Sequence, residues 1–146
     1  LVLVKAVAYI MRLGDTGLAD ASAKAVLNAN YLAEQVGYEV PYRPFHHEFV
    51  ASAGDQDAAE VAKRMLDHGV HPPTTKWPTL VEEALMTEPT EVETKASLDE
   101  LADAFNAVRE EGSESFPDAP HRTAAGRIDQ ASAARNPRLS WQSLLD

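Results

Sequence analysis

Apolar residues occupy almost every position of residues 1–13, and this run ends at Gly14. Glycine is favoured directly after the last turn of a helix, so the run is predicted to be helical. A helix that is apolar on nearly all sides has to be covered by other protein, yet this one is too short to cross a membrane. We therefore expect residues 1–14 to be a helix that docks on a domain missing from this chain, and residues 15–146 to form one domain.

Three further segments carry apolar side chains at spacings of three and four, the pattern of a helix packed on a core. They are residues 15–37, 55–69 and 97–112, and each of them ends at a glycine. The third is predicted to begin at a capping box formed by Ser97 and Glu100.

Short extended stretches lie between and after these helices. Residues 38–43 and 46–53 are predicted to be neighbouring strands, and the proline-bracketed runs 74–77 and 83–88 are predicted to be two more. One or two further helical turns are expected around residues 128–134. Helices that alternate with short strand pairs predict an α+β fold, with a short, mostly antiparallel sheet and helices packed on one face.

The composition narrows the possible partners and location. The 146 residues include 23 Asp and Glu against 13 Lys and Arg, and the formal net charge of −10 argues against binding to nucleic acid. The absence of cysteine and of any apolar run long enough to span a bilayer leads us to expect a cytoplasmic protein with no membrane partner. The scattered acids suit adaptation to high salt, and an ordinary acidic domain is an equal alternative.

Histidines next to carboxylates raise the question of a metal site. His46 and His47 would point to opposite faces of a strand, and a helix end at Gly69 would separate His68 from His71. We therefore expect no metal site. The sequence also contains neither the glycine-rich phosphate loops of common nucleotide sites nor the Gly-x-Ser-x-Gly elbow of many hydrolases.

A proline-rich block is the most informative part of the chain for function. It contains His-Pro-Pro-Thr at residues 71–74, Trp-Pro at 77–78 and Glu-Pro-Thr-Glu at 88–91. Rigid loops that present imidazole, hydroxyl and carboxylate groups suit a site positioned by a scaffold. The same prolines could instead only shape turns, and from the residues alone this second interpretation is favoured.

Segments 26–32, 47–49, 67–74 and 86–95, taken in order, resemble the C-terminal part of glycine dehydrogenase (decarboxylating). This is the P-protein of the glycine cleavage system, and the resemblance is to its subunit 2 in organisms with a split enzyme. The closing stretches also resemble the end of that protein, at residues 119–121 and 136–141. The resemblance covers essentially the whole chain.

The resemblance implies the small C-terminal domain of an aspartate-aminotransferase-like, fold-type-I enzyme that uses pyridoxal phosphate. Enzymes of this family form an aldimine with glycine, release CO2 and transfer the aminomethyl group to the lipoyl group of the H-protein. The expected partners are therefore P-protein subunit 1, the lipoyl H-protein and the missing N-terminal large domain. A stand-alone binding module that has kept this small-domain fold is the alternative.

The resemblance also indicates what this chain lacks. The family's Schiff-base lysine follows a histidine in the large domain, and this chain has no His-Lys pair. We therefore predict no catalytic and no cofactor-binding residue here, an inactive chain when isolated, and a cofactor held mainly by the large domain. Position by position, His71, Thr74, Glu88 and Thr90 are candidates for facing the active-site entrance or the channel for the lipoyl arm.

Overall fold

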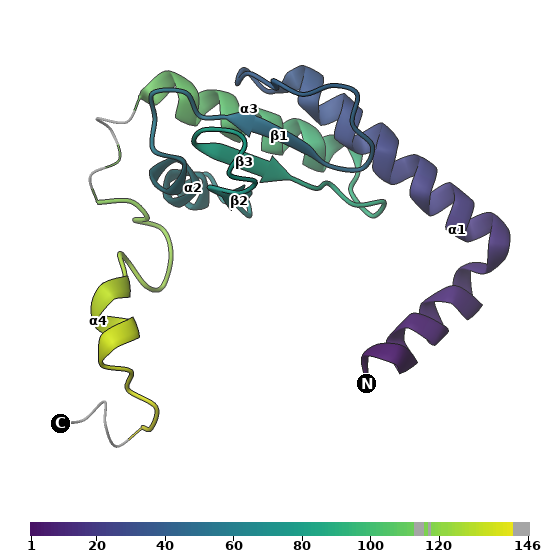
Figure 1. Cartoon of the computed structure of the whole chain (residues 1–146). Coiled ribbons are helices and arrows are strands. Elements are labelled where there is room, and N and C mark those ends of the chain that lie inside the picture. The colour runs from purple at the N-terminus through teal and green to yellow at the C-terminus, as the bar shows by residue number, and fades with distance from the viewer. Residues whose placement is uncertain (113–115, 117, 142–146) are drawn as a thin grey trace.

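A computed structural model of the chain describes residues 1–112, 116 and 118–141. The elements follow one another as α1 (Val2–Gln35), β1 (Phe49–Ser52), α2 (Ala58–Asp67), β2 (Thr74–Thr75), β3 (Ala84–Thr87), α3 (Lys95–Glu111) and α4 (Gln130–Arg135). The strands form a three-stranded antiparallel sheet in the order β1-β3-β2. Figure 1 shows α3 running behind this sheet, with the second half of α1 beside it. The predicted α+β architecture is confirmed.

The two faces of the sheet differ in burial because successive side chains of a strand point to opposite sides. Phe49 and Ala51 of β1, together with Leu85 of β3, point into the hydrophobic core. On the opposite face Val50 pairs with Met86, and both are half-buried. The helices therefore cover one face of the sheet, as the sequence predicted.

The core is formed by the apolar stripes of the amphipathic helices and the inner face of the sheet. The Phe105 ring on α3 is fully buried and meets the Tyr38 ring edge-on, with 6.1 Å between the ring centroids. The same core cluster takes residues from α1 and its C-cap, β1, α2, β3 and α3: Ala29, Leu32, Ala33, Val36, Phe49, Ala51, Val61, Met65, Leu85, Leu98, Ala102 and Val108. The predicted apolar face of the 97–112 helix is confirmed.

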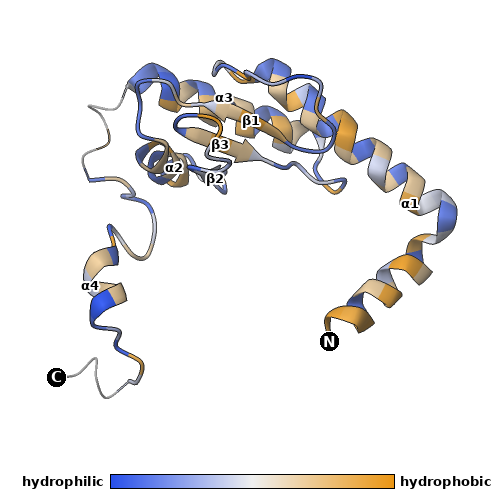
Figure 2. Ribbon diagram, viewed as in Figure 1, coloured by the Kyte–Doolittle hydropathy of each residue, from blue (hydrophilic) through white to orange (hydrophobic). Residues whose placement is uncertain are grey.

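The first helix bends at Gly14, where the sequence predicted a helix end. Gly14 has φ 63° and ψ −174°, a backbone conformation that glycine adopts readily, and the N-terminal turns leave the body there (Figure 1). The turns before the bend are strongly hydrophobic (Figure 2), and their side chains are exposed, with Leu3 at 81% and Met11 at 79%. This apolar helix has no cover within the described part of the chain.

The capping box of α3 differs from the prediction. The N-cap is Thr94, whose Oγ1 accepts from the backbone N–H of Ser97, while Ser97 Oγ accepts from the backbone N–H of Thr94. Ser97 therefore lies inside the first turn, and its predicted pairing with Glu100 was wrong. Thr94 takes the cap because Lys95 and Ala96 are good helix formers that extend the helix by one turn.

The predicted strand over residues 38–43 was also wrong in extent. Only an isolated bridge joins Glu39 to Ser52. The reason is that Pro41 has no N–H group to donate to a neighbouring strand. By contrast, the runs 74–77 and 83–88 contain β2 and β3, and α4 overlaps the expected 128–134 region, ending one residue beyond it.

None of the described helices is long and apolar enough to cross a membrane. The cytoplasmic location stays a prediction.

Candidate functional site

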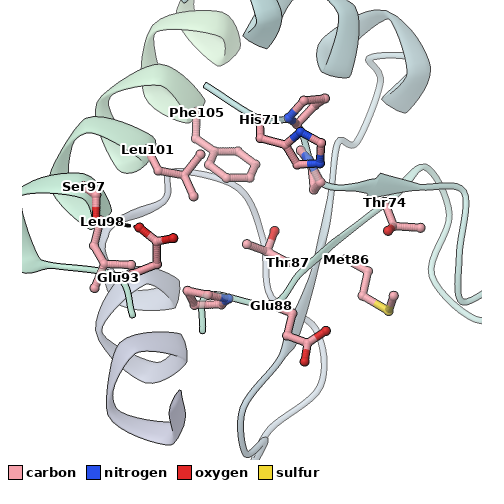
Figure 3. A pocket seen from close by; sticks show the side chains of 13 residues that line it. His71, Thr74, Met86, Thr87, Glu88, Glu93, Ser97, Leu98, Leu101 and Phe105 are labelled. Carbon is pink, nitrogen blue, oxygen red and sulfur yellow. Dashed lines mark hydrogen bonds between the residues drawn. The ribbon is translucent and has the colours of Figure 1, made fainter. Parts of the chain in front are cut away.

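A pocket of about 270 Å³ lies between the β2–β3 end of the sheet and α3. Figure 3 shows its lining from close by, with α3 on one side and the ends of β2 and β3 on the other. The lining residues are His71, Pro72, Pro73, Thr74, Met86, Thr87, Glu88, Pro89, Glu93, Ser97, Leu98, Leu101 and Phe105. We call this cavity the α3 pocket.

The pairing of β2 with β3 brings the two proline-bounded segments of the sequence together. Thr74 is the register partner of Met86, so the His-Pro-Pro-Thr loop and the Glu-Pro-Thr-Glu loop lie next to each other at the α3 pocket. Gly69, with φ 81°, ends the turn after α2 and begins the path toward His71. The chain can therefore reverse within a few residues of the α2 C-terminus.

Three of the four candidate residues from the sequence line this pocket. They are His71, Thr74 and Glu88. Thr74 and Glu88 lie at the rim, where Figure 3 shows both side chains directed away from Leu101 and Phe105. The fourth candidate, Thr90, lies outside the pocket lining, and its backbone carbonyl accepts from the amide of Asn28, with 2.8 Å between nitrogen and oxygen.

The inner wall of the α3 pocket combines an apolar surface with a buried hydroxyl group. Leu98 and Phe105 are buried and Leu101 is half-buried. Thr87 faces this wall (Figure 3); it is 6% exposed, and its Oγ1 has no hydrogen-bond partner among the described residues. Leaving such a hydroxyl unpaired costs free energy, so a group that hydrogen-bonds to it would stabilise the domain.

The charged groups of the α3 pocket are carboxylates. Glu93 accepts a hydrogen bond from the Ser97 hydroxyl at 2.7 Å between oxygens, and Glu88 lies 3.7 Å from the imidazole Nε2 of His47. Neither lysine nor arginine is among the residues that line the pocket. An anion in this pocket would therefore meet two carboxylates and neither a lysine nor an arginine.

A second groove lies beside the first helix. It has a volume of about 490 Å³ and is lined by Tyr9 and Leu18 of α1, by His46 and His47, and by Glu91 among others. The Tyr9 hydroxyl donates to the Glu91 carboxylate at 2.7 Å, which lowers the pKa of Glu91. The N-terminal turns of α1 are thus tied to the loop that carries Thr90.

The lysines are placed as surface cations. Lys76 is 2.7 Å from the Asp57 carboxylate, Lys63 is 2.7 Å from Glu60, and Lys95 is 2.6 Å from Asp99. The hydrogen bonds to these acids raise the pKa of Lys76 and of Lys95. A Schiff-base lysine needs the opposite shift, and a phosphate group needs cationic or amide donors. The other two lysines, Lys5 and Lys24, are exposed on α1, so no lysine of this chain is placed as the Schiff-base residue of a pyridoxal phosphate site.

The strand predicted over residues 46–53 was too long, because β1 begins at Phe49; His46 and His47 precede the strand, and both line the second groove. His68 binds Glu111 at 3.0 Å, whereas His71 lines the α3 pocket. Within the described residues, no group of three or more His, Asp or Glu side chains is arranged to hold a metal ion.

Sequence reasoning missed a cluster around the buried carboxylate of Asp67. This group accepts from the backbone N–H groups of His121 and Arg122 at 2.6 and 2.8 Å, from His121 Nδ1 at 2.9 Å and from Arg64 at 3.1 Å. Burial opposes its ionisation, but these hydrogen bonds outweigh burial and hold the pKa of Asp67 well below its usual range. These hydrogen bonds attach residues 121 and 122, where the C-terminal segment of the chain begins, to the end of α2.

Comparisons with known proteins point to one family. The family model for the glycine dehydrogenase C-terminal domain matches residues 21–125. A probable glycine dehydrogenase (decarboxylating) subunit 2 from Halobacterium salinarum is 76% identical over 143 residues, which is 98% of this chain and 30% of that protein. The protein of the same description from Caldanaerobacter subterraneus is 45% identical over 151 residues, covering 96% of this chain and 31% of that protein.

A solved structure agrees with the sequence relatives. The crystal structure of an inhibitor-bound glycine decarboxylase, the P-protein of the glycine cleavage system, superposes with a TM-score of 0.61 at 26% identity. The match covers 68% of this chain and 24% of that one. The chain thus spans about 30% of the length of the curated relatives that it matches. The Halobacterium relative supports the interpretation of the acidic composition as an adaptation to high salt.

The family match covers the strands, α2, α3 and the loops of the α3 pocket, and the relatives extend it to nearly the whole chain. The chain belongs to the family of glycine dehydrogenase C-terminal domains.

Proposed function

We propose that this chain is the C-terminal domain of a pyridoxal-phosphate-dependent subunit that decarboxylates glycine in the glycine cleavage system. The observation that carries the proposal is the family match over residues 21–125, which includes both proline-bounded loops of the α3 pocket. In this proposal, the aminomethyl group left after loss of CO2 passes to the lipoyl group of the H-protein, and subunit 1 of the P-protein completes the enzyme.

The cofactor is held outside this chain in this proposal. Two observations support that assignment: Lys63, Lys76 and Lys95 are paired with acids, and neither lysine nor arginine lines the α3 pocket. The isolated chain is then inactive and binds pyridoxal phosphate weakly or not at all. Titration with the cofactor tests this point: a saturable aldimine absorbance band that one lysine substitution removes would refute it.

The role of the domain is to shape the entrance to the active site or the channel for the lipoyl arm. His71, Thr74 and Glu88 present an imidazole, a hydroxyl and a carboxylate at the α3 pocket. Thr90 belongs to the neighbouring loop, which Asn28 ties to α1. These groups orient an incoming arm by hydrogen bonds and exclude water with the adjacent prolines.

Alanine substitutions test the entrance in the complete enzyme. We expect H71A, T74A, E88A and T90A to lower the rate of H-protein-dependent glycine decarboxylation, with the largest change in KM for the H-protein. A matched control is E110A, because Glu110 is an exposed acid of α3 that does not line the pocket. Unchanged decarboxylation and unchanged glycine–CO2 exchange in all four variants would remove the entrance assignment.

The helix at residues 1–14 connects this domain to the large domain in our proposal. Its exposed apolar side chains and the bend at Gly14 support that role. Hydrogen exchange tests the contact: amides of the first helix should exchange slowly in the complete polypeptide and rapidly in the isolated chain. Equal exchange in both would contradict the proposed contact.

A further inference from the structure

We infer that the α3 pocket is a binding site for an aliphatic cation, a short hydrocarbon chain that ends in an ammonium or guanidinium group. The inference goes beyond the proposed function, because it assigns to the same pocket a ligand that, unlike the lipoyl arm, carries a positive charge. It does not depend on which reaction the complete enzyme performs.

The apolar wall accounts for the hydrocarbon part of such a ligand. Leu98, Leu101 and Phe105 form one continuous side of the pocket, and Pro72 and Pro89 help to close it. A chain of a few methylene groups laid against this wall loses contact with water, which is favourable for both surfaces. The volume of about 270 Å³ limits the ligand to a small molecule or to a single side chain.

The charges of the lining select a cation over an anion. Glu93 is an exposed acid whose carboxylate already accepts one hydrogen bond, from Ser97, and retains further acceptor sites. Glu88 adds a second carboxylate at the rim, and no lysine or arginine lines the pocket. The amide groups of Thr94 and Ser97 at the start of α3 are occupied by the capping box, so they are not free to bind an anion.

The buried hydroxyl of Thr87 is the independent sign of a ligand. Thr87 lines the pocket, and its buried Oγ1 has no partner among the described residues, although native proteins pair almost all buried polar atoms. A hydroxyl oxygen accepts a hydrogen bond from an ammonium or guanidinium N–H. Bound in this way, the cation would be held by Thr87 from within the pocket and by Glu93 from its rim.

The probe for the test is n-butylguanidinium, added to the complete enzyme and followed by calorimetry and saturation-transfer NMR. A guanidinium group, unlike a primary amine, does not condense with the aldehyde of pyridoxal phosphate, so binding at the cofactor cannot mimic the result. The matched neutral probe is n-butylurea, which has the same shape without the charge. We expect saturable binding of the cation and binding of the urea that is weaker by about ten-fold, the equivalent of one charge-assisted hydrogen bond.

Two conservative variants assign the site. E93Q keeps the acceptor for Ser97 and removes the charge, and T87V keeps the shape and removes the hydroxyl. Each should weaken n-butylguanidinium by about ten-fold, whereas E110Q on the exposed side of α3 should bind like the wild type. T87V should also raise the thermal midpoint of the unliganded protein, because the unpaired hydroxyl is gone; this shows that its loss of binding is not a folding defect.

The source of the cation is distinguished by a second arm of the test. A short peptide with a single central lysine and its acetyl-lysine counterpart are added in competition with n-butylguanidinium. Displacement by the lysine peptide but not by its acetyl-lysine counterpart identifies a protein side chain as the natural ligand, and no displacement by either peptide identifies a small molecule.

The inference is overturned if n-butylurea binds as tightly as the cation, if both variants bind like the wild type, or if no saturable binding occurs up to the solubility limit of the probe. Glycine–CO2 exchange is measured on the same samples. Normal exchange without probe binding would remove this inference and leave the proposed function intact. Probe binding without glycine–CO2 exchange in the assembled enzyme would instead remove the proposed function and leave this inference intact.

Discussion

The buried carboxylate of Asp67 gives the sharpest test of how the C-terminal segment is held on the domain. Replacing it by asparagine keeps the shape of the side chain and removes the charge. The four donors that now converge on the carboxylate belong to His121, Arg122 and Arg64, and the Asp67 side chain is only 2% exposed. In D67N the new amide N–H atoms face those donors, so at least two of the four hydrogen bonds are lost.

The expected loss of stability depends on how exposed the hydrogen-bond partners of Asp67 are. A hydrogen bond to a charged group is worth about 1.5 to 3 kcal/mol, but a donor that can turn to water recovers part of this. The side chains of Arg64 and His121 are 24% and 54% exposed, so both recover some hydration. We therefore expect D67N to lower the free energy of unfolding by about 2 to 3 kcal/mol at neutral pH, below the cost of breaking a fully buried ion pair.

The pKa of Asp67 determines how the stability difference between wild type and D67N changes with pH. The folded state holds the pKa of Asp67 below its ordinary value of 3.8, so the stabilising contribution is complete above that value. It is lost as the pH falls through the lowered pKa of the folded state. The gap between wild type and D67N should therefore be constant near neutrality and should start to shrink below about pH 4.

Urea denaturation at constant high ionic strength, followed by circular dichroism, measures the difference in unfolding free energy between wild type and D67N. The control is D103N, because Asp103 is an exposed acid on α3 and its substitution should change the unfolding free energy by less than about 0.5 kcal/mol. A D67N variant as stable as D103N at neutral pH would refute the reasoning, and so would a gap that stays the same at pH 3.

Three further predictions concern the packing, the cap and the turn, and each is tested by the same denaturation assay. F105A removes a fully buried ring and should cost about 3 to 5 kcal/mol, whereas F105L should cost less than half of that. T94A removes the N-cap of α3 and should cost about 1 kcal/mol; an equal effect of E100A would instead favour the Ser97–Glu100 capping box that the sequence predicted. G69A forces a side chain into φ 81° and should cost about 1 kcal/mol, while no effect would show that the turn relaxes without strain.

The sequence predicted the elements whose signals are local. The helical spacing of Leu98, Leu101 and Phe105 depends only on neighbours three and four residues away, and the glycines at 14, 69 and 112 have positive φ where helical segments end. The capping box was misplaced because Thr94 and Ser97 both have hydroxyls that can serve as caps. The pattern alone does not decide which one the helix uses.

The site was predicted less completely because it depends on contacts between distant residues. The paired strands explain why His71 and Glu88 meet, and two proline-bounded runs were a usable signal for that pairing. The Asp67 cluster joins residues 54 and 55 positions apart, and no local pattern distinguishes this aspartate from an ordinary surface acid at a helix C-terminus. Such a group becomes visible only when the fold shows its burial.

The exposed first helix and the entrance residues are connected through one hydrogen bond. Tyr9, on the apolar turns before the bend at Gly14, donates to Glu91, which directly follows the candidate residue Thr90. Asn28, after the bend, donates to the carbonyl of Thr90 itself. The loop is thus held from both halves of α1, so a partner that covers the apolar turns would contact the helix that holds one edge of the proposed entrance. Glycine at position 14 lets the first turns of α1 take more than one direction. The direction that a covering partner selects would therefore also affect the position of the loop that Tyr9 contacts.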